Sequence, residues 1–147
     1  MLQGPASKSV AVAEVADIPV NRKADALEFL HTFHPAAEPK SGETPTVFEY
    51  VVTLADGRTV TVPVAYRRGV GPWLAPAAKT LPQAAVAWSA KFPEGKGPAD
   101  KVAVVYQMTW TNPHPDTEIR AVTLRRAPGP PLGTPILFAV TASTLVK

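Results

Sequence analysis

The sequence predicts an all-β protein: a single antiparallel β-sandwich of jelly-roll type with about seven or eight strands. Segments whose larger side chains alternate with a period of two recur along the chain, as in strands that bury one face. The 17 prolines and 9 glycines among 147 residues interrupt these segments often and leave little room for long helices. We expect one domain over residues 9–147, preceded by an N-terminal arm of residues 1–8.

The stretch Val102–Leu124 carries the clearest strand pattern. Its larger side chains fall on alternate positions from Val102 to Trp110, which indicates a strand with one face on a core. The segment Thr111–Asp116 then ends the strand, because its two prolines lack backbone donors. Ile119–Leu124 is extended again. We therefore expect the two strands to form one connected unit at the centre of an antiparallel sheet.

The N-terminal third of the chain is less regular. Ser9–Val15 is a weak strand, and Ile18-Pro19-Val20 starts a turn. Ala26–Phe33 could be a helical face or a strand with Leu27, Phe29 and His31 on one side. Its short length and the proline at position 35 favour the strand.

A hairpin follows a loop over residues 35–45. Val47–Leu54 and Thr59–Val64 both alternate, and they flank Ala55-Asp56-Gly57-Arg58. Asp-Gly readily supplies the positive φ that tight hairpins need. Pro63 is expected where its missing donor faces no neighbouring strand.

The remaining segments are separated by loops rich in glycine and proline. Arg67–Leu81 is a long connection, and Ala84–Ala90 is either a strand or a short helical turn. Further loops cover residues 92–100 and 127–135. Ile136–Thr144 is expected to close the fold, with Ile136, Phe138 and Val140 on one face.

Composition excludes several classes of protein. The net charge is +3, but the basic residues are scattered, whereas nucleic-acid binding needs a cluster on one face. The absence of cysteine excludes disulfide scaffolds, thiol nucleophiles and cysteine-ligated zinc. No window reaches membrane-spanning length, and the first 15 residues hold no signal-peptide core. We expect a soluble chain without membrane insertion; if its parent is exported, the signal lies outside this sequence.

No motif predicts catalysis. His31, His34 and His114 do not have the spacing of a metal site, and we expect a half-buried His31 and two solvent-facing histidines. Asp116 and Glu118 flank a turn, where a structural role is favoured over acid/base chemistry. The expectation is a non-enzymatic protein without metal or cofactor.

Three pieces of the sequence, in this order, resemble a galactose-binding-like β-sandwich, a type found as accessory modules in large exported bacterial proteins. They are ALEFLHTF at 26–33, YVVTLADGRTVTVPV at 50–64, and TWTNPHPDTEIRAVTL at 109–124 followed by PILFAVTAST at 135–144. The resemblance implies an extracellular or periplasmic sandwich module. Many such domains place an acidic residue before a tryptophan soon after the hairpin, whereas Trp73 here follows Gly71-Pro72.

The tryptophans are the best candidates for a binding site. Trp110 follows the inward alternation and Trp88 lies among alanines, so both are expected to pack. Trp73 lies in a long loop and is the candidate for exposure, with Tyr66 and Arg67 beside it as a polar-aromatic patch. The functional expectation is a module that binds carbohydrate or a protein surface; the alternative is a structural subunit that makes homotypic contacts.

Overall fold

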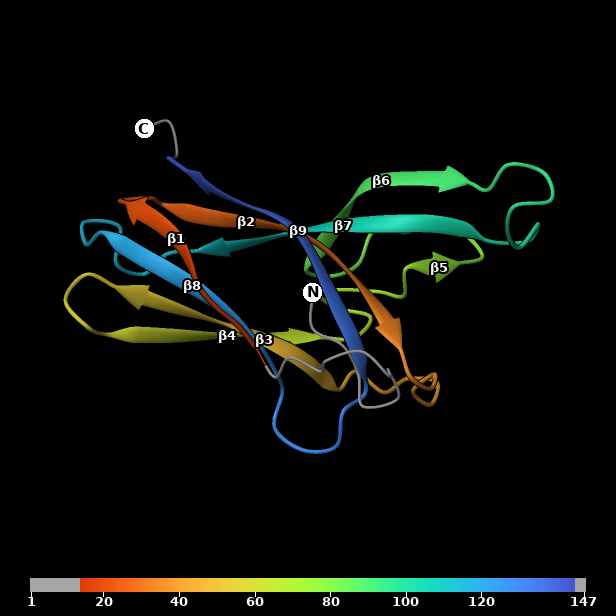
Figure 1. Cartoon of the computed structure of the whole chain (residues 1–147), viewed down its shortest axis with the longest axis horizontal. Coiled ribbons are helices and arrows are strands. Elements are labelled where there is room, and N and C mark those ends of the chain that lie inside the picture. Colours follow the sequence, from red (N-terminus) through yellow and green to blue (C-terminus); the bar gives the residue numbers. More distant parts are fainter. Residues whose placement is uncertain (1–13, 145–147) are drawn as a thin grey trace.

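The computed structural model describes residues 14–144, and Figure 1 shows their arrangement in two layers of strands. These residues contain no helix, and therefore none that could cross a membrane. The predicted arm of residues 1–8 and most of the first predicted strand lie outside the described residues. The strands are β1 (Glu14–Arg22), β2 (Ala26–Pro35), β3 (Thr46–Leu54), β4 (Thr59–Ala65), β5 (Leu74–Ala75), β6 (Ala84–Lys91), β7 (Val102–Thr111), β8 (Ile119–Arg126) and β9 (Gly133–Ser143).

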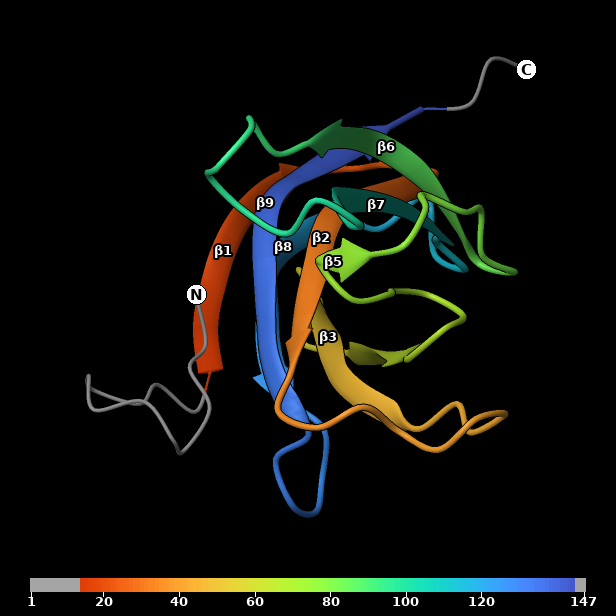
Figure 2. The same ribbon diagram turned by 90° about the vertical axis from the view of Figure 1, so that its right-hand side faces the viewer.

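The strands form two antiparallel sheets, which confirms the predicted all-β sandwich. One sheet has the order β1-β8-β3-β4. The other contains β6, β7, β2 and β9 in that spatial order, and the short β5 pairs with β7 at Val102 and Ala103, beyond the part of β7 that pairs with β2. Figure 2 shows the edge strands β1 and β9 side by side along one seam between the sheets. This arrangement is compatible with a jelly roll.

The prediction that the two central strands form one unit within a sheet is wrong. β7 belongs to the five-stranded sheet and β8 to the four-stranded sheet. The proline-containing turn between them crosses from one layer to the other, because Pro113 and Pro115 cannot continue the ladder of β7. Hairpins within one sheet most often use shorter connections of about two to five residues.

The core lies where β2 and β7 face β3 and β8. Leu27, Phe29 and Phe33 of β2 are fully buried, which confirms the strand reading of this segment. The ring of Phe29 stacks on that of Tyr50 in β3, with centroids 3.9 Å apart. Each such buried ring removes a large apolar area from water, so these contacts between the layers dominate the stability of the fold.

The hairpin between β3 and β4 forms as predicted. Gly57 has φ = 90°, and the amide of Leu54 donates to the carbonyl of Arg58. Alternate pairs along an antiparallel ladder exchange hydrogen bonds, which places Pro63, opposite Glu49, at a position that exchanges none. The ladder therefore loses nothing through the missing donor of Pro63.

β1 corrects another expectation. The predicted turn at Ile18-Pro19-Val20 is part of a continuous edge strand. Pro19 is tolerated because β1 is an edge strand, where a missing backbone donor is acceptable. Register shifts with positive φ at Asp17 and Asn21, on either side of Pro19, accommodate the fixed backbone angle of the proline. Ala84–Ala90, for which the sequence allows a strand or a short helical turn, lies within the strand β6.

β9 departs from strict alternation, and the predicted shared face of Ile136, Phe138 and Val140 is wrong. Leu30 pairs with Ala139 but His31 pairs with Leu137, so Phe138 is an extra residue in a β-bulge. Leu137 and Val140 pack against the core, whereas Phe138 is 60% exposed. A one-residue bulge changes the face of every residue beyond it.

Candidate functional site

The structure places two of the three predicted site residues together, but in a structural role. Tyr66 is fully buried, and its hydroxyl donates to a carboxylate oxygen of Glu38 at 2.9 Å. The guanidinium of Arg67 lies 5.0 Å from the centre of the Tyr66 ring and donates to the same Glu38 oxygen at 3.0 Å. Burial, with a smaller contribution from the bond to Glu38, raises the pKa of Tyr66 far above its usual value. Neither residue forms an exposed patch.

Arg67 also holds the loop between β2 and β3 in place. Its guanidinium donates to the backbone carbonyls of Pro39, Lys40 and Glu43 at 2.9–3.0 Å. Charge-assisted bonds of this kind are stronger than neutral ones. Because the guanidinium donates to four oxygens of one loop, its main role is to order that loop.

Trp73 is half-buried at the end of the five-stranded sheet. Its ring makes edge contacts with His34 and Phe92, with centroids 5.9 Å and 6.4 Å apart. Its backbone amide donates to the carbonyl of Phe33, and its carbonyl accepts from the amide of Val104. Trp73 is therefore built into the sheet and does not stand on a free loop, and the predicted trio is not a single platform.

A small apolar cavity of about 220 Å³ lies beside this region. Tyr106 forms part of its wall, and burial raises the pKa of this phenol to about 12. A Cβ at Gly71 would lie 2.5 Å from the Tyr106 hydroxyl, so only glycine permits this packing. The cavity is lined by Arg67, Gly71, Pro72, Ala75, Pro76, Ala77, Lys79, Leu81 and Tyr106.

The three histidines lie in three different environments. His31 is fully buried, not half-buried as expected, and its ring nitrogens contact the Tyr50 hydroxyl and the Gly69 carbonyl. His34 is exposed, and His114 is half-buried in the β7–β8 turn. Across residues 14–144, histidines and carboxylates form no group of three that could hold a metal ion.

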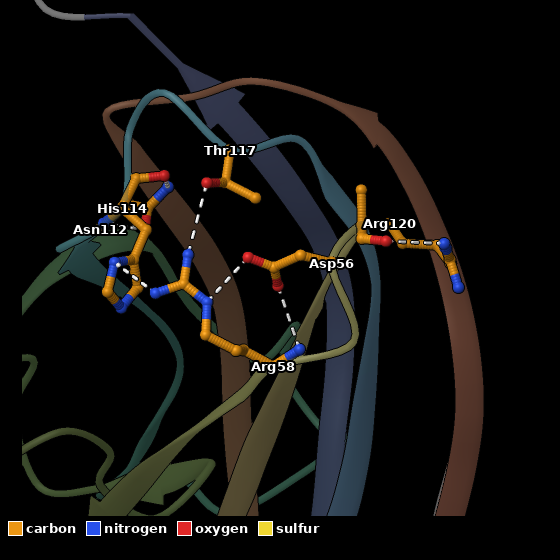
Figure 3. A network of polar contacts seen from close by, with 7 residues as sticks. Asp56, Arg58, Asn112, His114, Thr117 and Arg120 are labelled. Atoms are coloured by element: carbon orange, nitrogen blue, oxygen red, sulfur yellow. Dashed lines mark hydrogen bonds and ion pairs between the residues drawn. The ribbon is translucent and has the colours of Figure 1, made fainter.

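The turn after β7 forms a polar network with the β3–β4 hairpin (Figure 3). The guanidinium of Arg58 donates to Asp56, 2.7 Å away, and to His114 and Thr117 at 3.3 Å and 3.4 Å. The Asn112 amide oxygen accepts from the backbone amide of His114 at 2.9 Å and so closes the turn. Hydrogen bonding to the Arg58 amide lowers the pKa of Asp56. These exposed groups bond with one another, so the network joins the β3–β4 turn to the β7–β8 turn.

Trp88 contradicts the expectation that it packs, because 55% of it is exposed. Val86 pairs with Tyr106 and is partly buried against the core, but Trp88 pairs with Val105. Ala87 is thus the extra residue of a β-bulge in β6. Without the bulge, Trp88 would share the inward face of Val86; with it, the indole lies on the outer face of the five-stranded sheet.

We call this outer face the aromatic face, defined by Trp88, Val105, Leu30, Ala139 and Phe138. Cross-strand pairing places these residues at neighbouring levels on β6, β7, β2 and β9. Trp88 and Phe138 lie at its two sides, three strand spacings or about 14 Å apart. Leu30, Val105 and Ala139 between them are half-buried.

Polar residues flank the aromatic face at one end. Glu28 and Gln107 lie on the same outer face, and the Gln107 amide donates to the Glu28 carboxylate at 3.0 Å. Thr109 and Thr141, both exposed, are the cross-strand neighbours of Glu28. The apolar strip therefore ends at a rim whose charged group already has a hydrogen-bond partner.

Sequence reasoning missed the aromatic face because two bulges create it. Trp88 lies two positions after Val86, and Phe138 two positions before Val140, and both valines pack against the core. Strict alternation would therefore assign both aromatic side chains to the interior. The only signal in the sequence is the small residue beside each aromatic, Ala87 and Ala139. Trp110 does pack partly against the core, as expected.

Comparison of the chain with protein-family models, curated protein sequences and solved structures found no match.

Proposed function

We propose that this chain is a non-catalytic assembly module, in which the aromatic faces of two copies pack against each other. The observation that supports this most directly is the pair of bulges in β6 and β9, the two edge strands of the sheet. Each bulge turns one aromatic residue outward onto the same face. Bulges often re-aim a side chain in this way for a purpose, and contiguous exposed apolar surface marks interaction sites.

A second copy suits this face because the face is self-complementary. In a twofold arrangement, residue i of one copy contacts residue j of the other, and j contacts i. An axis through the middle of the strip would place Trp88 of each copy over Phe138 of the other. The strip itself is uncharged, and Glu28 at its rim is already bonded to Gln107, so packing leaves no unpaired charge at its centre.

Sedimentation velocity over a range of about 10–500 μM protein tests this proposal by mass action. We expect a shift from monomer to dimer as the concentration rises. Trp88→Ser and Phe138→Ser should each keep the protein monomeric over this range, because truncated aromatic anchors weaken interfaces most. Leu132→Ser is the matched control, since Leu132 is 37% exposed but lies in the β8–β9 loop.

Two results would overturn the proposal. One is a wild-type protein that stays monomeric at every concentration. The other is association that Trp88→Ser and Phe138→Ser leave unchanged, because this would place the contact elsewhere on the molecule. Circular dichroism and melting temperature of each variant confirm that the sandwich is intact before the comparison is made.

A further inference from the structure

A second surface, away from the aromatic face, has the chemistry of a small-molecule site. It is a groove of about 380 Å³ at the seam where β4 and β7 belong to different sheets. This volume falls within the range of ordinary ligand pockets. The groove is lined by Val62, Pro63, Gln83, Met108, Thr109 and Trp110.

The groove exists because β6 is shorter than the strand beside it. β6 starts opposite Met108, so within the described residues no strand covers β7 from Thr109 to Thr111 on that side. The amide of Asn112 donates toward the β1–β2 turn, to Asp25. Because successive residues of a strand direct their backbone groups to opposite sides, those of Thr109 and Thr111 point toward the uncovered side.

Gln83 is held rigidly at the rim of the groove. It occupies the tip of a tight turn, in which the amides of Leu81 and Ala84 donate to each other's carbonyls. Its own backbone amide donates to the carbonyl of Arg68 at 2.9 Å. Pro82 at the second position of the turn further restricts the backbone. The exposed carboxamide side chain therefore projects from a fixed base.

The lining defines what the groove would bind. The half-buried indole of Trp110 and the thioether of Met108 offer an apolar surface. The Gln83 carboxamide both donates and accepts hydrogen bonds, and so do the uncovered backbone groups of Thr109 and Thr111. Among the described residues that line the groove, none carries a charge, so a charged ligand would leave water without a counter-ion.

We propose that this groove binds a neutral, polyhydroxylated ring with one apolar face, of the kind that a pyranose sugar presents. The ring stacks on Trp110, and its hydroxyl groups bond with the Gln83 side chain and with the uncovered backbone of β7. This site is independent of the proposed self-association, which uses the outer face of Trp88 and Phe138.

Proton–nitrogen NMR of the full chain tests the site, because its three tryptophans give three separate indole signals. The probes are glucose, galactose, mannose and cellobiose at millimolar concentrations, with glucuronate as the charged comparison. We expect at least one neutral sugar to shift the Trp110 indole signal in a saturable manner, and glucuronate to shift it far less. Trp→Phe variants assign the three signals.

Substitutions then locate the hydrogen bonds. Gln83→Ala should weaken sugar binding about tenfold or more, because it removes a hydrogen bond to the ligand. The melting temperature should stay unchanged, because the side chain is exposed. Gln107→Ala is the matched control, because it removes the same amide from the outer face of the sheet. Trp110→Phe keeps an aromatic floor and should weaken binding without abolishing the fold.

The proposal is overturned if no neutral sugar in the panel shifts the Trp110 signal. It is also overturned if sugars shift only Trp73 or Trp88, or if Gln83→Ala binds as tightly as the wild type. None of these outcomes bears on self-association, which sedimentation velocity measures in the absence of sugar.

Discussion

Nδ1 of His31 lies 2.7 Å from the Tyr50 hydroxyl, and this contact joins the two sheets through the core. Nε2 lies 2.8 Å from the Gly69 carbonyl, which can only accept. Nε2 therefore carries the proton, and Nδ1 accepts from the Tyr50 hydroxyl. One neutral tautomer therefore satisfies the His31 ring, the Tyr50 hydroxyl and the Gly69 carbonyl. Protonation would add an N–H at Nδ1, which would point at the hydroxyl that now donates to this atom.

Acid should destabilise the protein through His31. Burial lowers its pKa from 6.5 to about 4, only partly offset by the bond to Gly69. The unfolded chain therefore takes up the proton first, and stability falls as the pH drops from 6.5 to about 4, with no further loss from this residue below that. The difference is worth roughly 3 kcal/mol at about 1.36 kcal/mol per pH unit.

Urea unfolding of wild type and His31→Gln across this pH range measures the effect. The glutamine keeps hydrogen-bonding groups but cannot titrate, so the variant should show a flatter dependence over this interval. His34→Gln, at an exposed position, should behave like the wild type. Identical slopes for His31→Gln and the wild type would mean that His31 does not titrate as its burial requires.

Gly57→Val should destabilise the β3–β4 hairpin by about 1–3 kcal/mol. A Cβ at this position meets nothing within 4 Å, so the loss comes from φ = 90° alone, which a β-branched residue resists. Gly57→Asn should lose less, because asparagine tolerates the left-handed region. Thermal unfolding compares the two, and equal melting temperatures for Val and wild type would contradict the turn geometry.

Trp110→Ala should lower the free energy of unfolding by about 3 kcal/mol, the lower end of the range for large aromatic truncations. The lower end applies because the ring is half-buried, with one side on the core and one on the groove. Denaturant unfolding measures this loss. A change below roughly 1 kcal/mol would show that the indole does not support the core.

Arg67→Lys should loosen the β2–β3 loop. Lysine cannot reproduce the planar fork that bonds Glu38 and three carbonyls. We expect limited proteolysis to cut between residues 36 and 45 several-fold faster, with little change in melting temperature. Arg68→Lys, at an exposed neighbour, is the control. Unchanged cleavage in Arg67→Lys would mean that other contacts order the loop.

Alternation and turn chemistry predicted the local elements well. The Asp56-Gly57 hairpin, the strand at Ala26–Phe33 and the inward series from Val102 to Trp110 all depend on neighbours in the sequence, and all three are confirmed. Such features follow from periodicity and from the special φ of glycine, which are local properties.

The missed features depend on partners far along the chain. No local pattern separates β7 and β8 into different sheets, because crossing between layers is a property of the whole topology. The bulges at Ala87 and Phe138 exist only relative to β7 and β2. The hydrogen-bond partners of Arg67 likewise lie 24–29 residues away along the chain. Its closeness to Trp73 in the sequence therefore does not reveal its structural role.

Disulfide trapping tests the central proposal most directly, because the chain has no cysteine of its own. Leu30 lies in the middle of the aromatic face, where a twofold axis would bring it close to its copy. Mild oxidation of Leu30→Cys should give a covalent dimer in high yield, since bridging needs Cβ atoms about 4 Å apart. Thr61→Cys, exposed on the other sheet, should stay monomeric. Equal trapping of both variants, or none of Leu30→Cys at concentrations where the wild type associates, would contradict face-to-face assembly.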